Sequence, residues 1–271
     1  MTKNDYIGIA ANSRDPRYYV NPKAKIGKNV VLEHGCVIDA ETVIGDNCYI
    51  GPNTVIHGGT TIGNNCKFGV GVVLGTDPMD MKWKGGKTYV KIGDNCNFEN
   101  YVTVARAADE ENTTIVGKGT ILMSHSFVAH DCIVGEENIF TNGATLAGRV
   151  KTGNNVTLGA YTAIQPRQVI GDFVYTGWNC GIHKDIPPYL RIIEQNGPLR
   201  YVGINIVGLR RKNYSNEVIT EIRNMYRLIY ESDMPLRKAM IEIQNTFNDT
   251  PHKNNILKSI TNSKKGIIKK I

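Results

Sequence analysis

ILMSHSFVAHDCIVGEENIFTNGATLAGRV, residues Ile121 to Val150, has an apolar residue at every sixth position. These positions are Leu122, Val128, Val134, Phe140 and Leu146. An α-helix repeats every 3.6 residues and a strand every two, so neither explains a period of six. A six-residue period is typical of a parallel β-helix, in which each coil has three flat sides and successive coils stack as strands. The stretch therefore predicts a mainly β chain folded as a triangular prism.

The period extends far beyond this stretch. It holds from Ile26 to Leu74, from Ile92 to Val104 and from Val116 to Ile182, which predicts about eight coils of eighteen residues. Loops at 75–91 and 105–115 interrupt it. Glycine follows five of the first nine apolar positions, and we expect these glycines to adopt backbone angles closed to other residues. The predicted organisation is an N-terminal cap over 1–20, a β-helix over 21–186, and a linker with C-terminal helices over 187–271.

Three helices are expected in the last segment. Ser215 is a good N-cap for the first. Asp233 can cap the second, with Pro235 in its first turn, and a short third helix begins near His252. These helices are expected to pack on the β-helix or on other subunits and to have no direct part in catalysis.

Composition limits the class of protein. The 271 residues are 41% hydrophobic and 21% charged, and no apolar run is long enough for a membrane span. The N-terminus lacks the apolar core of a signal peptide, so a cytoplasmic location is expected. The net charge of +7 lies largely in lysines of the C-terminal tail, which we interpret as solvated and not as a nucleic-acid site. All six cysteines stand two residues before an apolar position, where they are expected to pack as small hydrophobes.

The eighteen-residue coil brings chemically useful residues together. It places Gly148 beside His130, and Arg149 beside Asp131, at about 4.8 Å, one strand spacing. Histidine can take a proton from a hydroxyl or ammonium group at neutral pH. The Gly148 N–H could stabilise the oxyanion of an acyl-transfer intermediate. Asp131 has two possible roles, since it can orient His130 or form an ion pair with Arg149.

The loop at 75–91 is the second candidate feature. Asp80, Lys82 and Trp83 lie in it among glycines, and basic with aromatic residues suit the phosphates and base of a nucleotide. A solvated hairpin explains the same residues equally well. The spacing His125-x4-His130 also permits two ligands of a carbonic anhydrase-like metal site, but a third ligand is missing nearby, so we expect no metal.

Four segments together resemble one family. VAHDCIVGEENIFTNGATLAGRV, DIPPY, GINIVGLRRKNYS and LGTDPMDMKWKGGKTYVKIGD are similar to the UDP-N-acetylglucosamine O-acyltransferase of lipid A synthesis. The resemblance spans nearly the whole chain. It implies left-handed coils, a homotrimer with active sites between subunits, and no permanently bound cofactor. The cosubstrate it implies is an acyl thioester, either acyl-coenzyme A or an acyl carrier protein.

The resemblance also implies roles for individual residues. His130 is the general base, Gly148 the oxyanion donor, and Asp80 and Lys82 contact the sugar and phosphates. Three further residues, Asn205, Arg210 and Arg211, match positions near the nucleotide or the acyl carrier.

Several positions depart from the family pattern. Phe127, Arg149 and Gln165 stand where the family has further histidines lining its cleft. The usual His-Arg-Gly is replaced by Ala105-Arg106-Ala107. Trp178 occupies the place of a small residue that sets acyl length, so the resemblance implies a shorter acyl group.

Three functions remain open from the sequence. We favour transfer of a short acyl group from coenzyme A to the amino group of a nucleotide-linked amino-deoxy sugar, with dTDP as one possible nucleotide. The alternative is the UDP-N-acetylglucosamine 3-O-acyltransferase itself, with acyl carrier protein as donor. A non-catalytic trimeric scaffold is the alternative from a different class.

Overall fold

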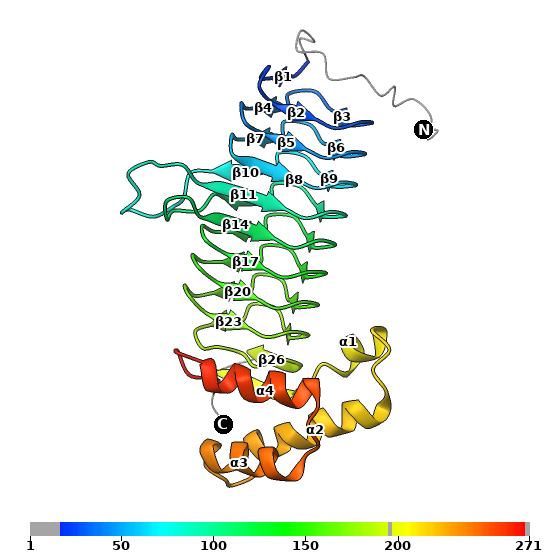
Figure 1. Cartoon of the computed structure of the whole chain (residues 1–271), viewed down its shortest axis with the longest axis vertical. Coiled ribbons are helices and arrows are strands. Elements are labelled where there is room, and N and C mark those ends of the chain that lie inside the picture. Colours follow the sequence, from blue (N-terminus) through cyan, green and yellow to red (C-terminus); the bar gives the residue numbers. More distant parts are fainter. Residues whose placement is uncertain (1–16, 195–196, 269–271) are drawn as a thin grey trace.

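The computed structural model describes residues 17–194 and 197–268, and it is a left-handed parallel β-helix closed at its C-terminal end by helices (Figure 1). Three parallel sheets form the sides of the prism. Sheet A contains β1 (Tyr19–Val20), β4 (Val37–Ile38), β7 (Val55–Ile56), β10 (Val73–Thr76), β13 (Thr103–Ala105), β16 (Phe127–Val128), β19 (Thr145–Leu146), β22 (Ala163–Ile164) and β25 (Gly181–Ile182). Sheet B contains β2 (Lys25–Ile26), β5 (Val43–Ile44), β8 (Thr60–Ile62), β11 (Tyr89–Ile92), β14 (Thr113–Val116), β17 (Ile133–Val134), β20 (Lys151–Thr152) and β23 (Val169–Ile170).

Sheet C contains β3 (Val31–Leu32), β6 (Tyr49–Ile50), β9 (Lys67–Phe68), β12 (Asn97–Phe98), β15 (Ile121–Leu122), β18 (Ile139–Phe140), β21 (Thr157–Leu158), β24 (Tyr175–Thr176), β26 (Leu190–Glu194) and β27 (Leu199–Ile204). The register of β16 on β19 pairs Val128 with Leu146, which confirms the predicted eighteen-residue coil.

Three edges separate the sheets, and we name each by a residue on it. The His130 edge comprises the corners that lead from sheet A to sheet B, including the loops 77–88 and 106–112. The Lys212 edge comprises the corners from sheet B to sheet C, where α1 packs. The Trp178 edge comprises the corners from sheet C to sheet A.

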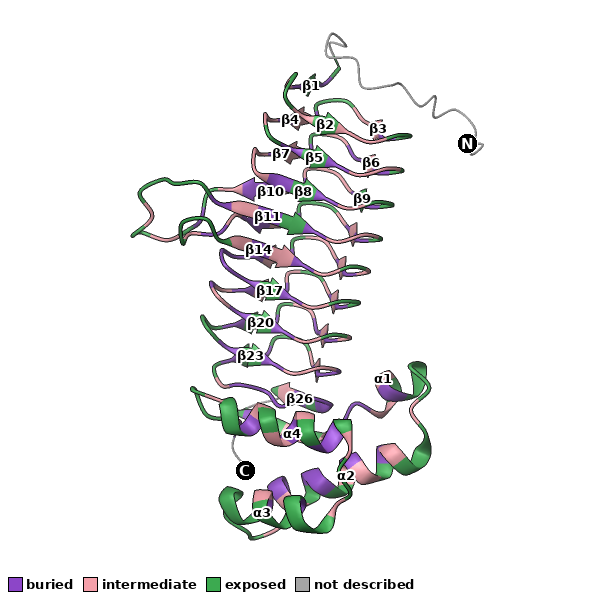
Figure 2. Ribbon diagram, in the orientation of Figure 1, coloured by how far each residue is buried: buried purple, intermediate pink, exposed green. Residues whose placement is uncertain are grey.

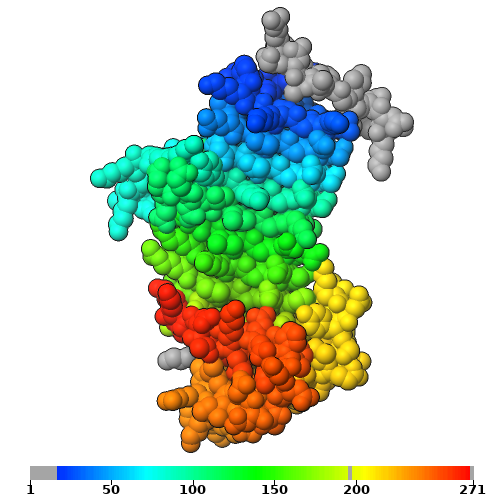
Figure 3. Space-filling model, viewed as in Figure 1, coloured from blue at the N-terminus to red at the C-terminus, as the bar shows by residue number. Residues whose placement is uncertain are grey.

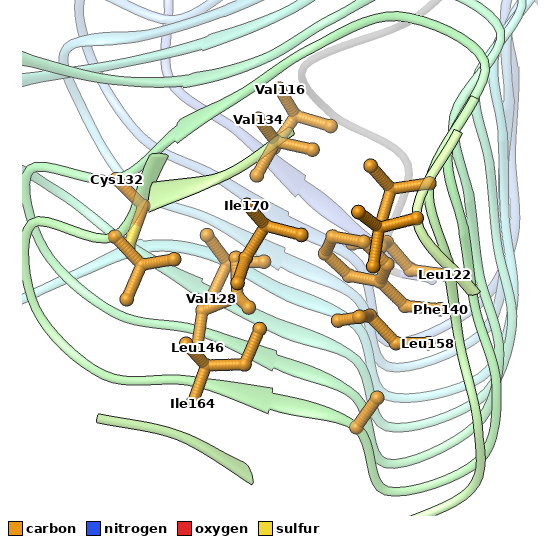
Figure 4. Close-up of a cluster of buried hydrophobic side chains, with 14 of the residues drawn as sticks. Val116, Leu122, Val128, Cys132, Val134, Phe140, Leu146, Leu158, Ile164 and Ile170 are labelled. Carbon is orange, nitrogen blue, oxygen red and sulfur yellow. The ribbon is translucent and has the colours of Figure 1, made fainter. Parts of the chain in front are cut away.

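The apolar residue of each hexad points into the prism. Leu122, Phe140 and Leu158 stack on one side and Val128, Leu146 and Ile164 on another (Figure 4), and all have at most 2% of their surface exposed. Buried purple positions alternate with pink or green ones along the strands, and some corners are buried as well (Figure 2). Two hexads carry threonine instead. Thr152 and Thr176 accept hydrogen bonds from the N–H groups of Gly135 and Gly159, so their hydroxyls are satisfied inside the core.

Glycine is required after the apolar positions for a different reason from the one predicted. Gly27, Gly45, Gly51, Gly63 and Gly69 do not have positive φ, so that expectation was wrong. A Cβ on Gly45 would lie 2.6 Å from the carbonyl oxygen of Gly63 in the next coil. These positions therefore require glycine because neighbouring backbones approach closely. The left-handed conformation occurs two residues later in the corner, for example at Asn47 (φ 58°).

The cysteines are buried and free, as predicted, but they also form hydrogen bonds. The thiols of Cys36, Cys48 and Cys132 donate to carbonyl oxygens at the same corner of the next coil, each at 3.2 Å. The hydroxyls of Thr54 and Thr120 do the same at 3.1 and 3.2 Å. The position therefore selects small side chains that can donate to the coil below, which a purely apolar interpretation missed.

The segment predicted as a linker is ordered structure. β26 pairs in parallel with β24 and extends sheet C, and β27 returns antiparallel to β26. In the described part of this segment, four helices follow instead of three: α1 (Ile206–Arg211), α2 (Asn216–Tyr230), α3 (Leu236–Thr246) and α4 (Pro251–Asn262). Ser215 caps α2 as predicted, whereas Pro235, and not Asp233, is the N-cap residue of α3. Tyr226 of α2 donates to Pro188 O, which anchors the helices to the end of the prism (Figure 3).

Most of the predicted N-terminal cap, residues 1–16, lies outside the described residues. β1 already pairs with β4, so the β-helix begins inside the segment assigned to that cap. In the described ranges, no helix has the length and apolar character needed to cross a membrane.

Candidate active site

His130 lies at the corner between β16 and β17, with 7% of its surface exposed. Its Nδ1 is 2.7 Å from Oδ2 of Asp131. An ionised carboxylate can only accept hydrogen bonds, so Nδ1 carries a proton, and in the neutral imidazole Nε2 then keeps the lone pair. The neutral imidazole is therefore held in the tautomer that leaves Nε2 free to act as a base.

Asp131 fixes more than the imidazole. Its carboxylate also accepts from the backbone N–H groups of Ala108 and Asp109, at 3.2 and 3.4 Å, and from Asn112 Nδ2 at 2.7 Å. Burial alone would raise the pKa of this carboxyl, but these hydrogen bonds, led by that from His130, outweigh burial and lower the pKa below its usual value. Asp131 therefore holds loop 106–112 against the corner that carries His130.

Gly148 follows His130 by one coil, as predicted, and packs directly against its ring. A Cβ at this position would lie 2.4 Å from His130 Nε2, so only glycine leaves the imidazole in place. Among the described residues, the Gly148 N–H donates to no backbone or side-chain acceptor. Beside the His130 ring, the buried Gly148 thus keeps an N–H that has no acceptor in the described part of the chain.

Arg149 contacts carboxylates from three segments. Its Nη2 lies 2.7 Å from Asp109 Oδ1 and 3.6 Å from Asp131 Oδ2, and its Nη1 lies 3.7 Å from Asp80 Oδ2. The hydrogen bond with Asp109 is the main reason that the pKa of the guanidinium is raised. Both roles considered for Asp131 are therefore present, but its bond to His130 is the shorter contact and Asp109 is the nearest partner of Arg149.

Loop 77–88 reaches the same edge through Asp80. The Asp80 carboxylate accepts from the N–H of Lys82 at 3.0 Å, and this bond, with the nearby His130 and Arg149, lowers the pKa of Asp80. Lys82 is exposed, and the half-buried Trp83 keeps its Nε1 without a hydrogen-bond partner in the described part of the chain. Gln165 lies on the same edge, two coils beyond the corner that carries His130, and is exposed. The structure thus gathers seven predicted residues and Gln165 on the His130 edge.

Three other predicted residues lie on the Lys212 edge. Asn205 is buried and caps α1, accepting from Gly208 N and donating to Phe173 O. Arg210 and Arg211 occupy the exposed end of α1, which Lys212 ties to Glu137 through a 2.6 Å ion pair. In a single chain these residues do not reach His130.

Trp178 lies on the third edge, and 73% of its surface is exposed. It borders a cavity of about 440 Å³ together with Arg191, Ile193 and Glu194. Within one chain this indole is not packed in a core.

His125 lies outside the site, whereas two residues that were not predicted from sequence belong to it. His125 stacks on Tyr101 on the Trp178 edge, so within one chain it does not face His130 and the two cannot share a metal. Asp109 and Asn112, which hold Arg149 and Asp131, were not predicted. The interruption of the hexads at ARAADEENTT marked their loop, but no periodic signal indicated which of its polar residues turn inward.

We expect Asp131→Asn to destabilise the fold by about 2 to 4 kcal/mol at pH 7, because a neutral amide replaces a buried carboxylate that accepts four hydrogen bonds. The folded-state pKa is lowered, so the stabilisation is complete above the unfolded-state pKa of about 3.9 and is lost as pH falls through the folded value. Denaturant unfolding of both proteins between pH 3 and 8 measures this.

Asp39→Asn is the control, because Asp39 pairs with His57 at 3.0 Å on the same edge but is 39% exposed. It should cost under about 1 kcal/mol. Equal effects of the two substitutions would contradict the anchoring role of Asp131.

Two family models match the chain. Residues 41–76 match the bacterial transferase hexapeptide model (six repeats), and residues 185–268 match the model for domain 2 of UDP-N-acetylglucosamine O-acyltransferase. The first covers coils of the prism and the second covers the end of the prism and the helices. The fold and site thus define a hexapeptide-repeat transferase.

Solved structures extend the match to the whole chain. A UDP-N-acetylglucosamine acyltransferase from Bacteroides fragilis is 36% identical, with 94% of this chain and 99% of that chain covered and a TM-score of 0.89. An Acinetobacter baumannii structure of the same family is 29% identical, with 94% and 99% covered and a TM-score of 0.88. The chain belongs to the UDP-N-acetylglucosamine O-acyltransferase family.

Curated relatives match a shorter region. The acyl-[acyl-carrier-protein]–UDP-N-acetylglucosamine O-acyltransferase of Synechocystis is 35% identical over 64% of this chain and 62% of its own length. That of Gloeothece citriformis is 32% identical over 66% and 64%. The aligned region thus spans less than two thirds of these relatives. Their names agree with the alternative function considered from sequence, O-acylation from acyl carrier protein, better than with the favoured N-acylation from coenzyme A.

Proposed function

We propose that this protein transfers an acyl group from the thioester of an acyl carrier protein to a sugar hydroxyl of UDP-N-acetylglucosamine. The observation that carries the proposal is the His130–Asp131 pair, with Nε2 of His130 packed on Gly148, whose N–H has no hydrogen-bond partner among the described residues. Acyl transfer needs a base for the nucleophile and a donor for the oxyanion, and these two groups supply them side by side.

The reaction follows from this arrangement. His130 Nε2 removes the proton of the sugar hydroxyl as its oxygen attacks the thioester carbonyl carbon. The carbonyl oxygen becomes an oxyanion, which the Gly148 N–H stabilises. As the C–S bond breaks, the imidazolium returns the proton to the departing thiolate, so the base is regenerated. Asp131 accepts from Nδ1 throughout and stabilises the imidazolium between the two proton transfers.

Substrate contacts on the same edge suit a sugar nucleotide. Asp80 lies 3.7 Å from Arg149 beside the base and can accept from sugar hydroxyls, and the exposed Lys82 can meet phosphate oxygens. Arg210 and Arg211 form a second cationic group that suits the nucleotide phosphates or an acidic carrier protein.

A donor and acceptor panel tests the proposal directly. UDP-N-acetylglucosamine with acyl carrier protein thioesters should give an O-acyl product that mass spectrometry detects. Turnover only with a dTDP-linked amino sugar and an acyl-coenzyme A would favour N-acylation. No product from any pair, with the sugar nucleotide still bound, would favour the scaffold.

We further propose a homotrimer with sites shared between chains, because the candidate residues occupy three separate edges of one prism. We expect co-expressed His130→Ala and Arg211→Ala chains, each nearly inactive alone, to form mixed trimers that regain about a quarter of the wild-type activity. In a mixed trimer, a site is complete wherever a chain with native His130 adjoins a chain with native Arg211.

Sedimentation of the wild type should show three times the mass of the chain. The control is a chain that carries both substitutions. Trimers of this chain alone should stay inactive. Failure of the mixed trimers to regain activity would place each site within one chain.

A further inference from the structure

We propose that Arg149 is a positioning residue, which gathers Asp80, Asp109 and Asp131 around His130 and keeps the imidazole unprotonated at neutral pH. The inference rests on the proposed function, since it concerns the base of that reaction. It assigns Arg149 a role toward the protein's own carboxylates in place of a direct contact with substrate.

The contacts of Arg149 come from three separate parts of the chain. Asp80 belongs to loop 77–88, Asp109 to loop 106–112 and Asp131 to the corner of His130 itself. The backbone N–H of Arg149 donates to His130 O at 2.9 Å, so the side chain starts from a point fixed by His130. One guanidinium therefore joins both loops to the catalytic corner.

The guanidinium of Arg149 forms one hydrogen bond with these carboxylates, to Asp109, and its contacts with Asp80 and Asp131 are ion pairs at longer distance. Nη2 serves Asp109 and lies near Asp131, while Nη1 faces Asp80, and only 26% of the side chain is exposed. Arg167, which follows Arg149 by one coil, is exposed.

Charge explains why the cation matters to the base. Asp131 is hydrogen-bonded to His130, and Asp80 on loop 77–88 lies close enough to interact with it electrostatically. Arg149 on the next coil pairs with both of these carboxylates and with Asp109 on loop 106–112, and Lys82 lies beside Asp80. Three carboxylates favour an imidazolium, which has no lone pair on Nε2 and cannot act as a base. The half-buried guanidinium of Arg149 among them opposes that protonation.

Histidine-labelled protein tests the inference without turnover. Two-dimensional NMR follows the imidazole signals from pH 5 to 9 in the intact protein, and His130→Gln identifies the His130 signal. Arg149→Gln should raise the His130 titration midpoint by about one pH unit, as expected for loss of one nearby charge. Arg149→Lys should remain within about half a unit of wild type, because the charge is kept.

Two further variants make the result decisive. Arg167→Gln removes the same charge one coil away and should shift the midpoint by under about 0.3 units. Asp109→Asn removes the carboxylate nearest to Arg149 and should lower the His130 midpoint, which keeps the test valid if Arg149→Gln fails to fold. A midpoint unchanged in both Arg149→Gln and Asp109→Asn overturns the inference.

Kinetics then link the midpoint to turnover. The acid limb of kcat/KM in Arg149→Gln should move to higher pH by the same amount, with kcat largely recovered at pH 8.5. If kcat/KM of Arg149→Gln is lowered by the same factor at every pH, the substitution has caused a structural defect only. Absence of acyl transfer in the wild type would remove the proposed function but leave the titration result standing.

Discussion

His130→Ala should lower kcat by about 10² or more while the Kd for the sugar nucleotide changes little, because a general base contributes to the transition state and not to ground-state binding. The imidazole is 7% exposed and its Nε2 packs on Gly148, so no other described side chain occupies that place. Steady-state kinetics and calorimetric titration with UDP-N-acetylglucosamine measure the two quantities separately.

His34→Ala is the matched control, since His34 is an exposed histidine on the Trp178 edge, several coils away. It should leave kcat within about twofold of wild type. If His130→Ala retains near-normal turnover, proton removal belongs to the substrate, another residue or the departing thiolate. That outcome would agree better with an amine nucleophile, which needs less help than a hydroxyl.

Trp178→Gly should raise kcat/KM for ten-carbon donors selectively, with acetyl to five-carbon donors remaining the best substrates of the wild type. The exposed indole borders a cavity of about 440 Å³ and occupies volume that a longer acyl tail would need. Each methylene that finds an apolar groove gains about 0.8 kcal/mol, so five more methylenes could change kcat/KM by about 10³. Competition between donors of different length measures the ratio directly.

Tyr161→Gly is the control for this test, because Tyr161 is an exposed aromatic residue one coil above Trp178 on the same edge. It should leave the chain-length preference unchanged. A wild-type preference for twelve- or fourteen-carbon donors would contradict the assignment of Trp178 as the residue that limits acyl length.

The sequence by itself determined the prism, because its defining interaction is local and periodic. A buried residue every six positions, as at Leu122, Val128 and Val134, requires three short sides per coil and leaves few other folds. The same period placed Gly148 against His130, since residues one coil apart are neighbours wherever no loop intervenes. Periodicity did not explain why glycine follows the apolar residue, because the cause at Gly45 is the backbone of another coil.

Only the tertiary structure decided how the site is held. The partners of Asp131 and Arg149 come from two loops that interrupt the period, and a loop without a repeat has no register from which contacts can be inferred. The β26–β27 hairpin was likewise taken for a linker, because it pairs with the end of a sheet that is complete only after folding. Repeats fix neighbours through local spacing, whereas Asp109 reaches Arg149 across forty residues only once the coils between them have stacked.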